Sequence, residues 1–336
     1  MQGTPRVVVS ASIAYDYIMS FDGSFKDHIL PDKTHVISVS FLLESLAHQR
    51  GGVGGNIAYN LALLGVPCAL VGAVGRDFGP YRDVFDALGI DMTNVMTIEE
   101  DLTASAFMNA DLAGNQIAAF YPGAMSRSDD VDVTPAARDA AFGLVGAGAP
   151  AAMRKHAEEI AAAGCKLVYD PSQQIVILSG EELRAGIELA DIVVGNDYEF
   201  GMIERKTGLT VDDIAAKVRL VAVTYGDRGS ELRLEGRSVS IPVAMPEVLA
   251  DPTGGGDAYR AGLLKGLLLE ADPAVAGRIA ALTATYAIER HGPQEHSFTV
   301  DEFCGRFAEA FPDFAEKVTV ETLQAQIGSP QRLVST

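Results

Sequence analysis

The sequence predicts an α/β fold in which a central, mostly parallel sheet is covered by helices on both faces. Short runs of Val, Ile and Leu alternate along the chain with Ala-rich amphipathic stretches, as expected when parallel strands are buried by the helices that connect them. Two regions, at about residues 15–50 and 100–122, break this alternation. With 336 residues, 48% of them hydrophobic, the chain can form one large domain that carries a small β-rich lid.

Strands are expected where the apolar runs are short and rich in β-branched residues. They are residues 6–13, 68–73, 142–145, 166–169, 191–194 and 220–224. Helices are expected where apolar residues recur at helical spacing over longer stretches. They are residues 55–64, 81–88, 151–163, 181–190, 198–206, 211–218, 255–270 and 273–291. Because helices and strands alternate, the connections are crossovers and the sheet is mostly parallel.

The two regions that break the alternation predict the lid. Residues 105–109 and 116–120 flank a turn at Gly114-Asn115 and have the pattern of a hairpin. Residues 15–50 are rich in Phe, Ser and His and are interpreted as extended segments. We therefore expect one domain over residues 1–330, with the lid inserted into its α/β body.

The charge of the chain excludes some classes of partner. With 26 Lys and Arg against 45 Asp and Glu, the formal net charge is −19, and such a field repels nucleic-acid phosphates and anionic lipid surfaces. No stretch reaches the roughly 18 apolar residues of a membrane helix, and the short apolar run 7–14 is interpreted as a strand, not a signal peptide. The cysteines are too scattered for a disulfide framework, so a cytoplasmic protein is expected.

A glycine-rich loop directly before an apolar helix is the most informative feature of the sequence. The segment 251–262 reads DPTGGGDAYRAG, and the backbone N–H groups of Gly254, Gly255 and Gly256 are not shielded by side chains. Together with the helix dipole, these groups form an anion-binding site beside the carboxylate of Asp257. The alternative is an ordinary helix after a glycine-rich turn, in which Asp257 only complements the dipole.

Four further motifs accompany this loop. They are SIAYD at 12–16, GGVGGN at 51–56, NDYE at 196–199 and VTYGDRG at 223–229. In this order, over about residues 6–310, the motifs resemble those of the PfkB, or ribokinase-like, family of ATP-dependent sugar and nucleoside kinases. The resemblance implies a ribokinase-like α/β fold with a lid.

Three other segments are similar to the bacterial adenosine kinases of this family. They are residues 121–126, 170–174 and 292–295. The chain departs from those kinases after residues 170–174, where no Arg occurs before Arg184. The resemblance implies transfer of the γ-phosphate of ATP to the 5′-hydroxyl of a nucleoside, with adenosine expected and a sugar kinase for ribose or fructose as the alternative.

The resemblance also implies roles for the glycine loop. Asp257 would take the proton of the attacking hydroxyl, and Gly254, Gly255 and Gly256 would stabilise charge on the transferred phosphoryl group. A carboxylate at a helix N-terminus is expected to stay ionised at neutral pH. Because its charge repels the triphosphate, Mg²⁺ is expected with ATP, and a monovalent cation such as K⁺ is a further expectation.

On the nucleotide side, the resemblance implies a set of ATP contacts. They come from Asn196, Thr224, Gly226, Gly229, Gly254, Gly256 and Gly292. Asn196 and Glu199 would orient Mg²⁺ through water, because Mg²⁺ keeps several of its waters in proteins. The alternative is a helix cap with the same spacing, in which Asn196 is the N-cap and Glu199 the third helical residue.

On the substrate side, Asp16 follows the first strand and could accept two hydrogen bonds from a ribose cis-diol. The substrate contacts that the resemblance implies are Ser12, Asp16, Ser40, Gly51, Gly52, Asn56, Phe107, Phe120 and Asp257. Phe107 and Phe120 would sandwich a purine on the lid hairpin. The alternatives are a solvated loop acid for Asp16 and plain packing for the two aromatic rings.

Two other classes of protein fit parts of the sequence. Residues 142–151 have the strand, G-x-G-x-x-A and helix pattern of a dinucleotide-binding unit, and Asp170 follows Gly146 by 24 positions. This NAD-dependent oxidoreductase interpretation lacks a hydride-transfer site and ignores the glycine loop. A non-catalytic nucleoside-binding protein is the other alternative. A homodimer is expected, since lid strands with open edges tend to pair between subunits.

Overall fold

The computed structural model describes residues 6–28 and 39–325, and its α/β body is built on one large sheet. The strands of this sheet are β1 (Val7–Ser10), β4 (Cys68–Gly75), β5 (Asp91–Ile98), β8 (Phe142–Val145), β9 (Lys166–Tyr169), β10 (Ile192–Asn196), β11 (Leu220–Thr224), β12 (Ser230–Leu234) and β13 (Arg237–Ile241). Their order is β13-β12-β11-β10-β9-β8-β1-β4-β5. The pairs from β11 to β5 are parallel, and β12 and β13 add an antiparallel edge.

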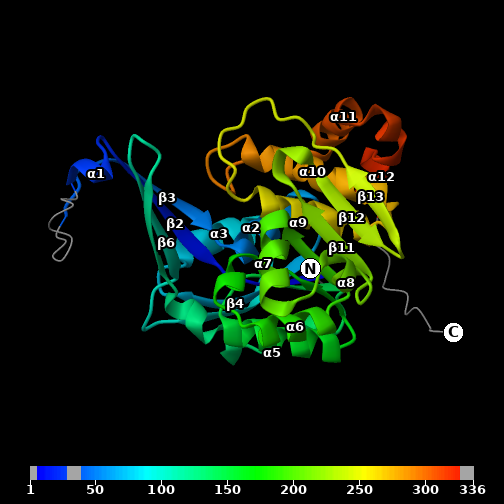
Figure 1. Cartoon of the computed structure of the whole chain (residues 1–336), viewed down its shortest axis with the longest axis horizontal. Coiled ribbons are helices and arrows are strands. Elements are labelled where there is room, and N and C mark those ends of the chain that lie inside the picture. Colours follow the sequence, from blue (N-terminus) through cyan, green and yellow to red (C-terminus); the bar gives the residue numbers. More distant parts are fainter. Residues whose placement is uncertain (1–5, 29–38, 326–336) are drawn as a thin grey trace.

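Helices cover both faces of this sheet (Figure 1). One face is covered by α2 (Val53–Leu63), α3 (Gly79–Ala87), α9 (Gly255–Leu268), α10 (Pro273–Ile288), α11 (Val300–Ala310) and α12 (Val320–Gln324). The other is covered by α4 (Thr134–Ala137), α5 (Pro150–Ala162), α6 (Gly180–Leu189), α7 (Asp197–Thr207) and α8 (Val211–Ala215). Of the helices in the described ranges, none is long and apolar enough to cross a bilayer.

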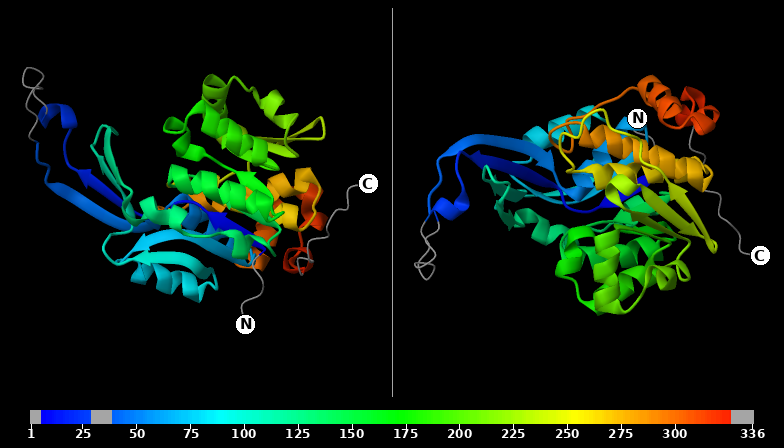
Figure 2. Two further views of the ribbon diagram at one scale, coloured as in Figure 1. Left: turned by 90° about the horizontal axis from the view of Figure 1, so that it is seen from below. Right: turned by 45° about the horizontal axis from the view of Figure 1, so that its top comes forward.

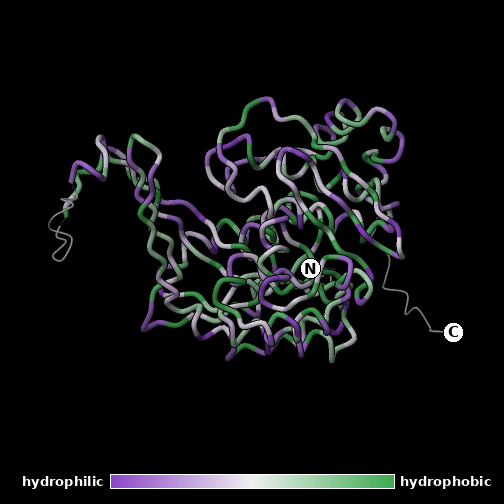
Figure 3. Tube along the Cα trace, viewed as in Figure 1, coloured by the Kyte–Doolittle hydropathy of each residue, from purple (hydrophilic) through white to green (hydrophobic). Residues whose placement is uncertain are grey.

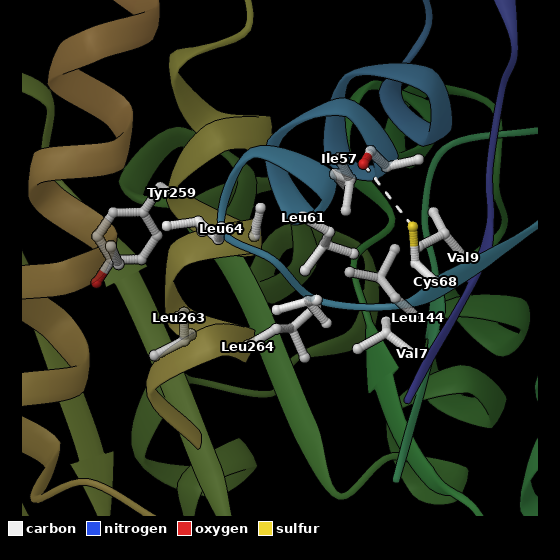
Figure 4. Packing of buried hydrophobic residues seen from close by; sticks show 14 of the residues in the cluster. Val7, Val9, Ile57, Leu61, Leu64, Cys68, Leu144, Tyr259, Leu263 and Leu264 are labelled. Carbon is white, nitrogen blue, oxygen red and sulfur yellow. Dashed lines mark hydrogen bonds between the residues drawn. The ribbon is translucent and has the colours of Figure 1, made fainter. Parts of the chain in front are cut away.

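The buried strands supply side chains to both layers. In β1, Val7 and Val9 pack into one hydrophobic cluster and Val8 into the other, because successive side chains of a strand point to opposite faces. Hydrophobic segments accordingly run through the interior of the body (Figure 3). Figure 4 shows Leu61 of α2 and Leu264 of α9 packed near these central strands. This packing holds α2 and α9 beside each other.

The lid is a separate sheet of four strands that projects from the body (Figures 1 and 2). It consists of β2 (Ala14–Phe21), β3 (Leu43–Gly51), β6 (Ala104–Ala110) and β7 (Gln116–Tyr121), in the order β3-β2-β6-β7. A short helix, α1 (Phe25–His28), follows β2. The two lid segments expected from the sequence therefore form one sheet, and the predicted fold class is confirmed.

Several element boundaries differ from the sequence-based expectations. The strand expected at 6–13 ends at Ser10, because the chain leaves the large sheet there and enters the lid as β2. The helix expected at 273–291 ends at Ile288. β5, the β12–β13 hairpin and α11 were not expected. β13 lies at the edge of the sheet and alternates polar residues with apolar ones, so it lacks the continuous apolar run of a central strand.

Candidate active site

The glycine loop leads into α9 as expected and is held by Asp251. One carboxylate oxygen of Asp251 accepts the N–H of Thr253 at 2.9 Å, and the other accepts the N–H of Gly292 at 3.2 Å. Gly254 has a φ of 79°, in the left-handed region, and no side chain caps α9. The N–H of Gly255 donates to the Pro252 carbonyl at 3.3 Å. The first turn of α9 thus begins without a side-chain acceptor, which suits an anion.

Asp257 lies in this first turn and is bound by the N-terminal part of α2. The Nδ2 of Asn56 donates to its Oδ2 at 2.8 Å. Burial raises the pKa of Asp257 to about 7, and the nearby Asp170 and Glu199 act in the same direction, whereas Arg260 and Asn56 oppose the shift. Loss of hydration therefore opposes the effect of the helix N-terminus on Asp257, and the ionised state expected at neutral pH stays a prediction.

A buried cation lies beside Asp257, although the sequence had given it no role. Arg260 is 6% exposed. Its Nη2 donates to Asp170 Oδ1 at 2.7 Å and lies 3.7 Å from Glu199 Oε2, and its Nε pairs with the second oxygen of Asp170. Burial and Asp170 raise the pKa of Glu199. One guanidinium thus faces three acidic groups, which leaves an excess of carboxylates at the site.

The carboxyl ends of neighbouring strands bring these groups together. Asn196 ends β10 and is in register with Thr224, the last residue of β11, while Asp170 follows β9. Ligands in open α/β sheets bind at this edge. Asp170 is fully buried against Arg260, so it is not free to bind the ribose of a dinucleotide. The dinucleotide-binding interpretation is therefore wrong.

Asn196 and Glu199 form a reciprocal helix cap at the start of α7. Asn196 Oδ1 accepts the N–H of Glu199 at 2.8 Å, and Glu199 Oε2 accepts the N–H of Asn196 at 2.7 Å. The capping alternative is confirmed. It leaves Glu199 Oε1 outside the cap, so orientation of a metal through water stays a prediction.

The remaining nucleotide-side residues shape turns. Gly226 and Gly229 have φ values of 62° and 87°, and a Cβ at Gly229 would collide with the carbonyl of Ile241. Gly292, with a φ of 100°, lies against the side chain of Gln49 on β3. Gly292 thus joins the glycine loop to the lid. Contacts of these residues with ATP stay predictions.

The substrate-side residues meet where the lid joins the body. The carboxylate of Asp16 lies against Gly51, where a Cβ would collide with it. Burial, and to a lesser degree Asp251, raises the pKa of Asp16 to about 6. Ser12 has a structural role, because its Oγ accepts the N–H of Val53 at 3.0 Å and its carbonyl accepts that of Gly54 at 2.8 Å. These bonds satisfy the start of α2.

The two aromatic rings expected to bind a purine, Phe107 and Phe120, lie on different faces of the lid. Phe107 is in register with Tyr17 and Ala119, whereas Phe120 is in register with Ala106, the partner of Asp16. Because residues in register share a face and neighbours alternate, Phe107 and Phe120 lie on opposite faces of the lid. They do not sandwich a purine between them. Phe107 stacks on Tyr17 instead, with ring centroids 4.9 Å apart.

Ser40, the other expected lid contact, is exposed in the segment before β3. Its neighbour Phe41 packs on Phe21, at the end of β2 that is remote from Asp16, so Ser40 lies away from the junction of lid and body. Part of the region 15–50, residues 29–38, lies outside the described residues. Tyr81 and Gln294, which sequence reasoning missed, are buried beside Asn56 and bonded to each other.

These features define a class of protein. A doubly wound body, a lid sheet at the carboxyl ends of its strands, and a carboxylate at the start of a helix that follows an uncapped glycine loop are the features of a ribokinase-like small-molecule kinase. The sequence model of the pfkB family carbohydrate kinases matches residues 16–299. The chain belongs to this family, and it is a phosphotransferase that acts on a hydroxyl group.

Similar proteins support this assignment. A nucleoside kinase of Methanothermobacter thermautotrophicus is 30% identical over 298 residues, which make up 88% of this chain and 93% of that protein. The Burkholderia thailandensis nucleoside kinase in complex with inosine has a TM-score of 0.83 and 39% identity, over 91% of this chain and 98% of that chain. Arabidopsis thaliana ribokinase, complexed with ribose and ATP, has a TM-score of 0.73 at 20% identity over 91% and 99% of the two chains, a likeness of fold.

Proposed function

We propose that this protein is a nucleoside kinase that transfers the γ-phosphate of ATP to the 5′-hydroxyl of adenosine, giving AMP and ADP. The observation that carries the proposal is the contact of Asn56 with Asp257 at the start of α9, beside the lid junction formed by Asp16 and Gly51. A base, an anion site and a diol acceptor thus come from three segments that surround one place. The likeness to nucleoside kinases favours a nucleoside over a free sugar.

In this mechanism Asp257 takes the proton of the 5′-hydroxyl as the bond to phosphorus forms. The N–H groups of Gly254 and Gly256 donate to the oxygens of the transferred phosphoryl group, and the helix dipole adds to their effect. The guanidinium of Arg260 lies against Gly256, where a Cβ would come within 2.7 Å of its Nη1. Its charge therefore acts beside the same phosphoryl group.

Mg²⁺ fits the charges of the site. Asp170, Glu199 and Asp257 lie around Arg260, and this excess of carboxyl groups favours a divalent cation that arrives with ATP. Within the described residues, no group of three His, Cys, Asp or Glu side chains could hold a metal ion. Glu199 Oε1 would therefore hold Mg²⁺ through water, and the ion would neutralise the phosphates. A monovalent cation such as K⁺ stays a prediction from the resemblance.

The protein would act as a homodimer through its lid. β3 and β7 are the edges of the lid sheet, and Leu46, Ile117 and Phe120 are exposed on them. Unpaired edges with apolar side chains favour pairing with another strand. A second copy of the chain supplies a matching edge, and light scattering at several protein concentrations tests the dimer.

A substrate panel tests the proposed function. Adenosine, inosine, guanosine, ribose and fructose are each offered with ATP and Mg²⁺, and ADP release is measured. We expect the highest kcat/KM with adenosine. A higher kcat/KM with ribose or fructose would favour a sugar kinase, in which Asp16 could still accept hydrogen bonds from the diol of the sugar. A higher kcat/KM with inosine would show that the preferred substrate is another purine nucleoside. No ADP release with any acceptor would contradict a kinase.

A further inference from the structure

A chain of buried hydrogen bonds links Asp257 to the lid. Asn56, Gln294 and Tyr81 are 4%, 2% and 0% exposed. Beyond Asn56, which donates to Asp257, the Nε2 of Gln294 donates to Asn56 Oδ1 at 2.9 Å and to the Tyr81 hydroxyl at 2.5 Å. The Tyr81 hydroxyl donates to the carbonyl of Gly51, the last residue of β3, at 2.9 Å.

The direction of this chain is fixed at its lid end. A backbone carbonyl only accepts hydrogen bonds, so the Tyr81 proton points to Gly51 and the Tyr81 oxygen accepts from Gln294. Gln294 must then present its NH₂ group toward Tyr81 and Asn56. Asn56 must accept with its Oδ1, which leaves only its NH₂ group to face Asp257. The orientation of both amide groups thus follows from one backbone carbonyl that can only accept a hydrogen bond.

We propose that Gln294 is a positioning residue of the reaction: it fixes the NH₂ group of Asn56 toward the base Asp257 and couples that base to the lid strand β3 through Tyr81. This inference rests on the proposed function, in which Asp257 is the base. An N–H donor stabilises the carboxylate form, whereas a carbonyl oxygen in the same place would stabilise the protonated acid. The orientation of Asn56 therefore decides how readily Asp257 accepts a proton.

The surrounding backbone is shaped for this chain. A Cβ at Gly55 would collide with the Tyr81 hydroxyl and approach Gln294 Nε2 to 3.3 Å, so glycine makes room for the chain. The residue before Gln294, Pro293, packs on Gly254, where a Cβ would lie 2.5 Å from that of the proline. Gln294 is thus held at the glycine loop on one side and at the lid junction on the other.

Other charged groups also face Asp257, and the test must separate them. Arg260 lies on α9, Asp170 follows β9 and Glu199 lies on α7, and all three affect the pKa of Asp257. None of them is bonded to Gln294 in the described part of the chain. An uncharged replacement of Gln294 therefore leaves these charged groups unchanged and releases only its two hydrogen-bond partners, Asn56 and the Tyr81 hydroxyl.

The experiment compares Gln294→Met and Tyr81→Phe with the wild type. Methionine keeps the length of the side chain without a donor, and phenylalanine removes only the hydroxyl. We expect kcat to fall by roughly 10- to 100-fold in Gln294→Met and less in Tyr81→Phe, which is below the roughly 10²- to 10⁴-fold contribution of the general base itself, because Asp257 is still present. KM for ATP should change by less than about twofold, because neither substitution removes a group that is proposed to bind ATP. The acid limb of the kcat–pH profile should move to higher pH in both variants.

Gln324→Glu, on the exposed face of α12, is the matched surface control and should keep the wild-type profile. An acid limb that stays at the wild-type pH in Gln294→Met and Tyr81→Phe would overturn the inference. A lower melting temperature in both variants would not rescue it, because loss of stability without a shift of the acid limb indicates a purely structural role. Failure of the proposed function would look different. The wild type would then release no ADP with any acceptor, or Asp257→Asn would retain full turnover.

Discussion

The body and the lid contribute to the site in different ways. On the body side, Asn56, Asp257 and Arg260 are held by bonds between buried or half-buried partners. On the lid side, Phe120 is 52% exposed and Ser40 is exposed as well. The comparison teaches that buried contacts hold the side chains around Asp257, whereas on the lid the side chains that could contact a nucleoside are exposed and depend on which lid face turns inward. Variants in the two halves should therefore fail in different kinetic parameters.

The largest effect is expected from Asp257→Asn. Loss of the base should lower kcat by roughly 10²- to 10⁴-fold, measured by ADP release at saturating ATP and nucleoside. Stability should change in the opposite sense. A carboxyl group whose folded pKa, about 7, lies above its unfolded value destabilises the native state as pH rises toward and past that pKa. Asparagine removes this penalty, so Tm should rise at pH 8 and change little at pH 4.

Circular dichroism and an ATP-binding titration are the controls for this variant. Intact folding and ATP affinity with lost turnover would support Asp257 as the base. Turnover within about tenfold of the wild type would contradict that role, since removing a general base costs more. A Tm that falls at pH 8 would instead contradict the raised pKa.

The next largest effect is expected from Arg260→Met, and it concerns stability. Removing one partner of a buried ion pair leaves Asp170 uncompensated, which typically costs about 3–5 kcal/mol. Urea unfolding at pH 7 measures the loss, and Asp170→Asn in the same chain should recover part of it. The lid offers the matched control, because the Arg50–Glu295 pair is 27% and 48% exposed. Arg50→Met should cost less than about 1 kcal/mol, and equal losses would show that the Arg260 cluster is not desolvated.

How much of the site could be predicted from sequence depends on whether its residues lie in one short motif or meet only in the folded chain. Asp257, Asn56 and Asp16 lie in short contiguous motifs, and the motifs indicated them. The alternation of strands and helices is also a local pattern, so the fold class could be predicted. The roles of Gln294 and Tyr81 could not be predicted, because Gln294 is separated from Asn56 and Tyr81 by 238 and 213 positions of the chain. Such contacts exist only once α2, α3 and the segment after α10 have packed.

The lid shows a second limit of sequence reasoning. The hairpin was predicted correctly, but its register decides which face each side chain occupies, and a shift by one residue exchanges the faces. Phe107 was therefore assigned to the substrate face, although the register places it with Tyr17 on the other. Edge elements such as β13 were missed because half-exposed strands carry a mixed pattern.

The register of the lid leads to a smaller, specific effect on binding. Phe120 shares a face with Asp16, so Phe120→Ala should weaken stacking of a base, which is worth about 1–3 kcal/mol. This corresponds to a rise in nucleoside KM of roughly 5- to 150-fold, with KM for ribose nearly unchanged. Phe107→Ala is the matched control and should alter nucleoside KM by less than about twofold. Equal increases in both variants would contradict the register or the stacking.

The smallest effect is expected from Asn196→Ala, which separates two roles of one residue. Loss of the N-cap of α7 should lower the free energy of unfolding by about 1 kcal/mol. Thr210→Ala removes the equivalent cap of α8 and should cost a similar amount. If Asn196 also orients water around Mg²⁺, its variant alone should require a higher Mg²⁺ concentration for half-maximal turnover. The same Mg²⁺ dependence in both variants would leave Asn196 as a cap, and Glu199 Oε1 would then be the oxygen to test next, because the cap does not use it.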